Sequence, residues 1–394
     1  MLRGSKPWNF GVHLSLVLVS YFIVLVLRTL HSIRRLPADP GYGYILGGAT
    51  NGISALTVGD PYFHVGARLL ALLTSIFPLE SQAIALALLV HVVWSTCGAI
   101  VAFVVRMQYE SDWFGYLAGL LLILSPHASE SSIGNVGNVK WPLLTALTLI
   151  ACSSKSSDRF RVSTLIFTMV VGLTQPLTIM CGLPIVMAIY RRRYISRQQL
   201  VFLGTISGTL LIQIAKVGLG TAFTGQASKV TMPWDGMGAF WWSGLLGPAI
   251  ISLFCIGALL IFRTRHGQNW HFNLSLSVQA LLLSVVSYRM GGIGDRYFVA
   301  PMALSLIAMF GTVIQITRQN LRFRYAGGAL LILLVLIPTA KWFSASWYLT
   351  SGPTWSEEVS RARVQCRELG YTQVELAVSP SGTEQLHCDF VLDE

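Results

Sequence analysis

Residues 82–104 read QAIALALLVHVVWSTCGAIVAFV, a run with no aspartate, glutamate, lysine or arginine. As an α-helix this run would be about 35 Å long, which exceeds the roughly 30 Å thickness of a bilayer's hydrocarbon core. We therefore predict a transmembrane helix at this point in the chain.

Comparable apolar runs recur through most of the 394 residues. The composition is 53% hydrophobic and only 11% charged, whereas soluble domains carry roughly 25% charged residues. We predict an all-α polytopic membrane protein with about eleven transmembrane helices. The predicted spans are 10–30, 82–104, 112–125, 140–152, 162–175, 176–190, 199–217, 240–262, 273–289, 297–317 and 324–346.

The net charge of +11 is concentrated in short clusters between these runs. That distribution is typical of cytoplasmic loops and argues against a nucleic-acid partner. With a cytoplasmic N-terminus, the inner segments hold 15 cations and 3 acids, and the rest holds 13 cations and 14 acids. The positive-inside rule thus predicts this orientation, although Arg28, Arg34 and Arg35 alone would favour the reverse. We interpret those three as candidate ligands for lipid phosphates on the outer face.

This topology divides the chain into a transmembrane domain, residues 1–346, and a small extracytoplasmic tail, residues 347–394. An odd number of spans places the tail outside. The first outer loop, residues 31–81, contains Asp39 and Asp60. If residues 62–77 form an interfacial helix, His64 and Arg68 share one face beside an apolar stripe.

Two further outer segments are rich in polar side chains. Glu130 precedes Asn135, Asn138 and Trp141, which follow one another at three-residue spacing. Either the amides line one face of a helix or they cap the helix that starts near Pro142.

The other segment is Asp295-Arg296-Tyr297, which precedes a late span. Structural roles remain open for all of these residues: Asp295 and Arg296 would pair only with each other, and Asp60 would cap a helix. His64 would be a packing residue, Arg68 would reach lipid phosphate, and Trp141 would join the aromatic belt.

In this order, the motifs resemble those of the GT-C class of polytopic glycosyltransferases, and in particular a poorly characterised bacterial group within it. The resemblance rests on an acid, an aromatic-x-His and an Arg in the first outer loop, an Asn-x-x-Asn-x-x-Trp motif, an Arg-Tyr-Phe motif, and paired tail cysteines. The matching residues are Asp60, Tyr62, His64, Arg68, Glu130, Asn135, Asn138, Trp141, Arg296, Tyr297, Phe298, Trp355, Cys366 and Cys388. Pro61 and Lys140 depart from the pattern and bear on substrate details.

The resemblance implies transfer of a sugar from a polyprenyl-phosphate carrier to a cell-envelope glycan or lipid acceptor, at the outer face of a bacterial plasma membrane. Asp60, or else Asp39, would be the catalytic base, and Arg68 and Arg296 would bind phosphate. His64, Glu130, Asn135, Asn138, Trp141 and Tyr297 would complete the substrate site. A divalent cation stays open as a cofactor, and Cys366 and Cys388 would form a disulfide in an oxidising compartment.

The alternative function is a transporter or flippase for a lipid-linked glycan. Such a protein typically carries ionisable groups at the midplane of several helices and a related second half. The sequence has neither feature clearly, since His91 is the clearest ionisable residue within a span.

Overall fold

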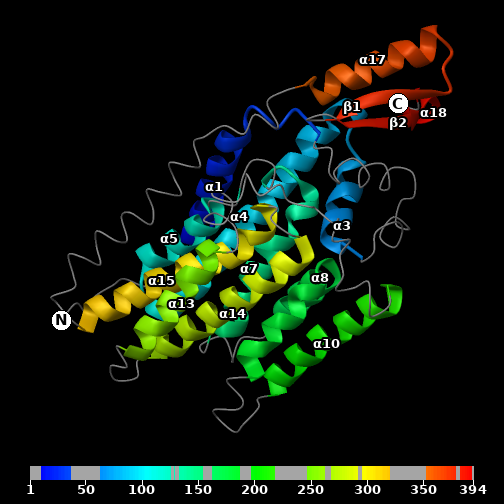
Figure 1. Ribbon diagram of the computed structural model, residues 1–394. Coiled ribbons are helices and arrows are strands. Elements are labelled where there is room, and N and C mark those ends of the chain that lie inside the picture. Colours follow the sequence, from blue (N-terminus) through cyan, green and yellow to red (C-terminus); the bar gives the residue numbers. More distant parts are fainter. Residues whose placement is uncertain are drawn as a thin grey trace, which may run out of the picture.

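The computed structural model describes residues 10–36, 63–125, 128, 133–153, 162–186, 197–217, 246–261, 268–291, 295–319, 352–378 and 382–392. The chain is mainly helical, as predicted, and its long helices form one bundle with the residues after 352 at one end (Figure 1). The helices of the bundle are α1 (Phe10–Thr29), α4 (Gln82–Tyr109), α5 (Asp112–Ile123), α7 (Lys140–Cys152), α8 (Val162–Thr174), α10 (Arg197–Val217), α13 (Leu246–Ile261), α14 (Gln268–Gly291) and α15 (Val299–Gln319).

Four helical segments among the described residues are long and apolar enough to cross a membrane: 79–109, 199–216, 269–288 and 296–317. This is consistent with a multi-pass membrane protein. Ten of the eleven predicted spans coincide with helix, several of them in shorter apolar pieces. The eleventh, 324–346, lies outside the described residues.

The predicted span 176–190 begins as the 3-10 helix η5 (Pro176–Cys181) and continues as α-helix to residue 186, and its last four residues lie outside the described ones. Gln175 is extended, with φ −146° and ψ 116°. A residue before proline is pushed out of the α region by the proline ring, so α8 ends at Thr174.

Glycines allow α1, α4 and α5 to approach closely. A Cβ atom on Gly119 of α5 would overlap the main-chain oxygen of Gly98 on α4. The hydroxyl of Tyr21 on α1 donates a 2.5 Å hydrogen bond to the carbonyl of Tyr116 across the same contact. Small residues serve membrane helices in this way because lipid provides little hydrophobic drive for helix association.

Polar contacts join α4 to α14 at the end of the bundle far from the tail, where α15 passes close to them. Gln108 donates to Asn269 over 3.0 Å, and the hydroxyl of Tyr109 donates to Asn273. A Cβ atom on Gly311 would overlap that hydroxyl, so glycine is required where α15 passes.

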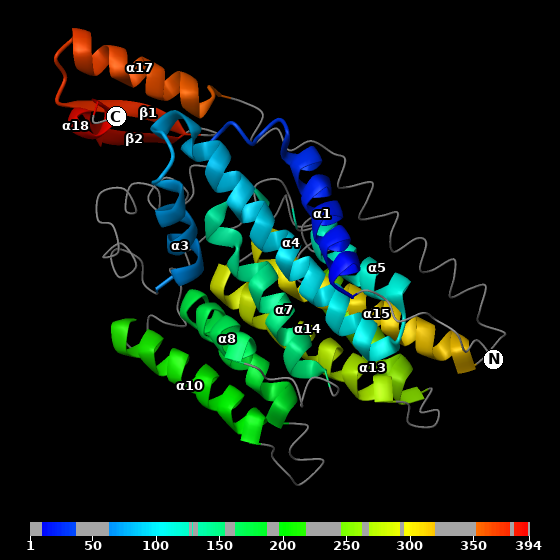
Figure 2. The same cartoon turned by 180° about the vertical axis from the view of Figure 1, so that it is seen from behind.

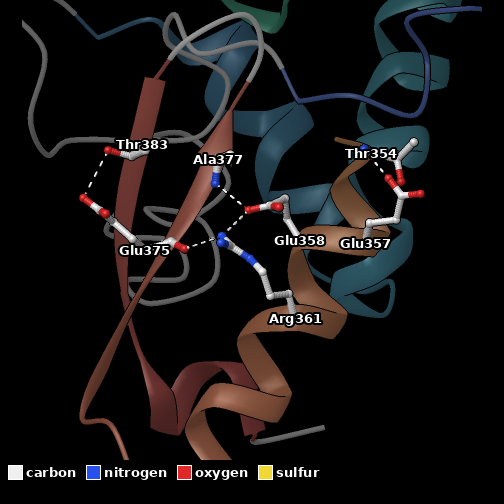
Figure 3. A network of polar contacts seen from close by, with 7 residues as sticks. All are labelled: Thr354, Glu357, Glu358, Arg361, Glu375, Ala377 and Thr383. Atoms are coloured by element: carbon white, nitrogen blue, oxygen red, sulfur yellow. Dashed lines mark hydrogen bonds and ion pairs between the residues drawn. The ribbon is translucent and has the colours of Figure 1, made fainter. Parts of the chain in front are cut away.

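The tail is a small folded unit, whereas the sequence pattern indicated only a polar segment. It comprises α17 (Trp355–Glu368), an antiparallel hairpin of β1 (Gln373–Val378) and β2 (Gly382–His387), and α18 (Cys388–Leu392). The buried carboxylate of Glu358 accepts a 2.7 Å hydrogen bond from the Ala377 amide, and this bond joins α17 to β1 (Figure 3). The same carboxylate forms an ion pair with Arg361.

The tail docks onto the start of α4 and the segment that follows α1, as both views of the bundle show (Figures 1 and 2). Arg363 forms an ion pair with Glu80 of the 3-10 turn η2 (Leu79–Ser81). The amide of Trp355 donates to the Arg34 carbonyl over 2.9 Å, and Arg35 donates to the Gly352 carbonyl over 3.1 Å. These contacts give Arg35 a structural role that the sequence did not predict.

Candidate functional site

The helix predicted over residues 62–77 is shorter, since α3 runs from Val65 to Thr74. His64 therefore precedes the helix instead of lying on its face, and its φ of 47° and ψ of 37° are left-handed. This conformation is uncommon for a residue other than glycine and is strained by about 1–3 kcal/mol. Arg68 stays close, because its amide donates a 3.1 Å hydrogen bond to the His64 carbonyl.

The two faces of α3 differ in the way the sequence predicted. Arg68 is only 6% exposed, on the side that packs into the protein, and His64 just before the helix is buried to the same extent. Leu69 and Leu73 are exposed on the other side, as is Ile76 just after the helix. An apolar exposed stripe over a buried polar face suits a helix at a membrane surface.

Main-chain groups around His64 are held by two other helices. The Gly66 amide donates a 2.8 Å hydrogen bond to the Thr174 hydroxyl on α8, and the Phe63 amide donates a 3.1 Å bond to the Gln213 side chain on α10. A Cβ atom on Gly66 would lie 2.9 Å from the Thr174 hydroxyl oxygen, so any larger residue would push α3 away. Contacts with α8 and α10 therefore fix where His64 and Arg68 lie.

The charges of three cations from three helices act on His64. Burial lowers the pKa of His64 well below its usual value of 6.5, and the charges of Lys140, Arg68 and Lys216 lower it further. The ammonium of Lys216 also lies 4.4 Å from the centre of the Phe63 ring. His64 is consequently a neutral imidazole at pH 7, set in a positive environment.

A row of aromatic rings extends from these cations toward the start of α15. The Lys140 ammonium lies 5.4 Å from the centre of the Trp141 ring, and that ring contacts Tyr297 edge to face at 5.6 Å. The guanidinium of Arg296 lies 5.4 Å from the Tyr297 ring centre. Arg296 and Tyr297 belong to η7 (Asp295–Phe298), the short 3-10 helix before α15. The structure thus brings Trp141, Arg296 and Tyr297 together, and Lys140 links them to His64.

Asn135 and Asn138 flank the same region on η3 (Val136–Asn138), which contacts α3 and α4. The Asn135 side chain accepts a 2.8 Å hydrogen bond from the Gly137 amide, so it caps this turn. Asn135 therefore caps η3, whereas the two predicted alternatives were a place on one face of a helix and a cap of the helix near Pro142. Both amides are buried.

Asp60, Asp39 and Glu130 lie outside the described residues. Two cations of the site were not predicted, namely Lys140, which departs from the family pattern, and Lys216, which ends a span. Among the residues that the structure describes, no group of three or more His, Cys, Asp and Glu could hold a metal ion. The pairing of Cys366 with Cys388 is present as a disulfide between α17 and α18.

Searches against protein families and against curated proteins found no match to this chain. The fold and the helix lengths define its class as a mainly helical protein with several helices able to span a membrane.

Proposed function

We propose that the protein is a membrane glycosyltransferase that moves a sugar from a polyprenyl-phosphate carrier to a cell-envelope glycan or lipid acceptor. The observation that carries the proposal is the group of cations beside the buried His64: the Arg68 amide donates to its carbonyl over 3.1 Å, Lys216 lies 4.4 Å from the ring centre of the adjacent Phe63, and Lys140 adds a third charge that acts on the imidazole. A lipid phosphate that leaves the sugar carries growing negative charge, and cations placed in a site of low dielectric stabilise it.

The neutral state of His64 suits a role in binding. A neutral imidazole donates one hydrogen bond and accepts another, whereas an imidazolium would only donate. In this proposal His64 bonds a phosphate oxygen or a sugar hydroxyl, and Arg68 holds the phosphate with its planar guanidinium. Trp141 and Tyr297 present rings to the sugar, while Asp60, or else Asp39, removes the proton from the acceptor hydroxyl.

The proposal includes eleven spans in a bacterial plasma membrane, with the N-terminus in the cytoplasm and the tail outside. Two observations support the placement of the tail. The first outer loop and the tail meet through the Trp355 and Arg363 contacts, as an outer location of both requires. A disulfide between Cys366 and Cys388 persists in an oxidising compartment, which the outside of a bacterial membrane provides.

The test is transfer from a radiolabelled polyprenyl-phosphate sugar by the full-length protein in liposomes. Arg68→Gln and Lys216→Gln should each reduce transfer by at least about tenfold, since each removes a charge-assisted bond to the phosphate. Arg367→Gln, on the exposed surface of the tail, is the matched control and should retain full transfer. Melting temperatures of all three variants verify that they fold.

The rival function, a flippase for a lipid-linked glycan, gives a different result in the same liposomes. A flippase would move the labelled lipid between leaflets and leave the sugar on its carrier. That outcome, or wild-type transfer by both site variants, would exclude the proposed glycosyltransferase mechanism.

A further inference from the structure

A groove of about 320 Å³ lies between α1, α4 and α5, at the end of the bundle far from the tail. Its volume is within the range of small-ligand pockets. Its walls are largely apolar and include Val17 of α1, Ala102 and Phe103 of α4, and Tyr116 of α5. The proposed glycosyltransfer uses none of these residues.

The groove has a polar end, where His13, Arg106, Asp112 and Trp113 lie at the helix termini. Arg106 and Asp112 form an ion pair that remains open to a ligand, because their side chains are 26% and 49% exposed. The apolar wall lies deeper, since Val17 is one helical turn beyond His13 and Phe103 is nearly one turn before Arg106. The groove is therefore charged at the membrane boundary and apolar toward the membrane interior.

Neighbouring surfaces indicate that lipid faces this groove. Leu16 and Val19, on the same helix as Val17, are 61% and 50% exposed. Trp113 is also exposed, at 56%, and tryptophan is typical of the level of lipid headgroups. The adjacent opposite charges of Arg106 and Asp112 complement a headgroup that carries both a phosphate and an amine.

We propose that this groove binds one phosphatidylethanolamine molecule of the bilayer. An acyl chain packs against Val17, Ala102 and Phe103, and the phosphate accepts hydrogen bonds from Arg106. The ammonium group donates to the Asp112 carboxylate beside the face of Trp113. A choline headgroup has no N–H to donate, and a glycerol headgroup has no cation, so both fit this end less well.

The first experiment uses the wild-type protein and requires no variant. Native mass spectrometry of the detergent-solubilised protein is performed with added phosphatidylethanolamine, phosphatidylcholine or phosphatidylglycerol of identical acyl chains. We expect one retained phosphatidylethanolamine, with an affinity about tenfold above that of the other two, as one charge-assisted hydrogen bond provides. Equal retention of the three lipids would refute the proposal.

Variants then locate the bound lipid. Val17→Trp fills the apolar wall and should abolish retention, whereas Val19→Trp places the same side chain on the exposed face of α1 and should not. Asp112→Asn should reduce the preference for phosphatidylethanolamine over phosphatidylcholine to near unity. Retention by Val17→Trp equal to that of Val19→Trp would show that the lipid binds elsewhere.

Discussion

The indole nitrogen of Trp355 donates a 2.7 Å hydrogen bond to the main-chain oxygen of Leu79, 276 positions earlier in the chain. Trp355 begins α17 of the tail and is 2% exposed, and Leu79 begins the turn before α4. One side chain thus joins the tail to the end of the bundle at which α4 begins.

Replacing Trp355 by phenylalanine should release the tail without unfolding the bundle. The change removes the hydrogen bond and leaves the Leu79 carbonyl without its indole donor, at a cost of about 1–3 kcal/mol. Limited proteolysis should cleave between the bundle and α17 in this variant. Tyr371→Phe, at an exposed aromatic residue of the tail, is the control, and equal cleavage of both variants would contradict the role of Trp355.

Exchanging the charges of Glu80 and Arg363 tests the second tail contact. Each side chain is about a quarter to a third exposed, so solvent screens the pair and its coupling should be about 0.5–1 kcal/mol. Glu80→Arg and Arg363→Glu should each increase proteolysis of the tail, and the double variant should reverse most of that increase. Additive effects in the double-mutant cycle would mean that the ion pair does not hold the tail.

Gly119→Ala should destabilise the packing of α1, α4 and α5. The new methyl group would overlap the Gly98 carbonyl, and overpacking of this kind lowers the free energy of unfolding by about 1–3 kcal/mol. Gly208→Ala on α10 is the matched control, because nothing lies within 4 Å of its added Cβ. In thermal unfolding in detergent, Gly119→Ala should have the lower melting temperature. Identical melting temperatures of the two variants would argue against the close approach of α5 to α4.

Gly66→Ala should impair the candidate site more than the fold. Its methyl group would meet Thr174 and shift the start of α3, which carries His64 and Arg68. Transfer should fall by at least about tenfold, because catalysis is sensitive to displacements near 1 Å. Gly257→Ala, where the added Cβ meets open space, should retain transfer. Equal sugar transfer by the two variants would show that the position of α3 does not affect catalysis.

His64 should make the protein less stable in mild acid. Its folded-state pKa lies well below 6.5, so below about pH 6.5 the unfolded chain binds a proton that the folded protein does not. The free energy of unfolding therefore decreases as the pH falls below that value. The melting temperature should drop between pH 7 and pH 5 in the wild type and drop less in His64→Gln. Parallel pH profiles for the two proteins would mean that another group is responsible.

The positions of the helices follow largely from the sequence, because a bilayer requires apolar runs of a particular length. The predicted span 140–152 coincides with α7, and 112–125 exceeds α5 by two residues. The strands of the tail also had a signal, since Val374, Leu376 and Val378 alternate with outward-facing residues at a period of two. That signal is short, and no strand was predicted there.

The candidate site was predictable only in part. Alternate connections of a membrane bundle meet at the same end, which explains why Trp141 and Tyr297 are in contact. The sequence could not indicate that Lys216 lies beside Phe63, because that contact depends on how α10 packs against its neighbours. The left-handed backbone of His64 was equally hidden, because its neighbours Phe63 and Gly66 are held by Gln213 and Thr174, which are far away in the sequence.

The contacts of Trp355 also fix an order of events during biosynthesis. Leu79 and Arg34 emerge from the ribosome early, and Trp355 follows Leu79 only after 276 further positions have been translated. The Leu79 carbonyl therefore lacks its indole donor until those positions have been translated. A chain that stops before Trp355 would leave this end of the bundle without the contact that joins it to the tail.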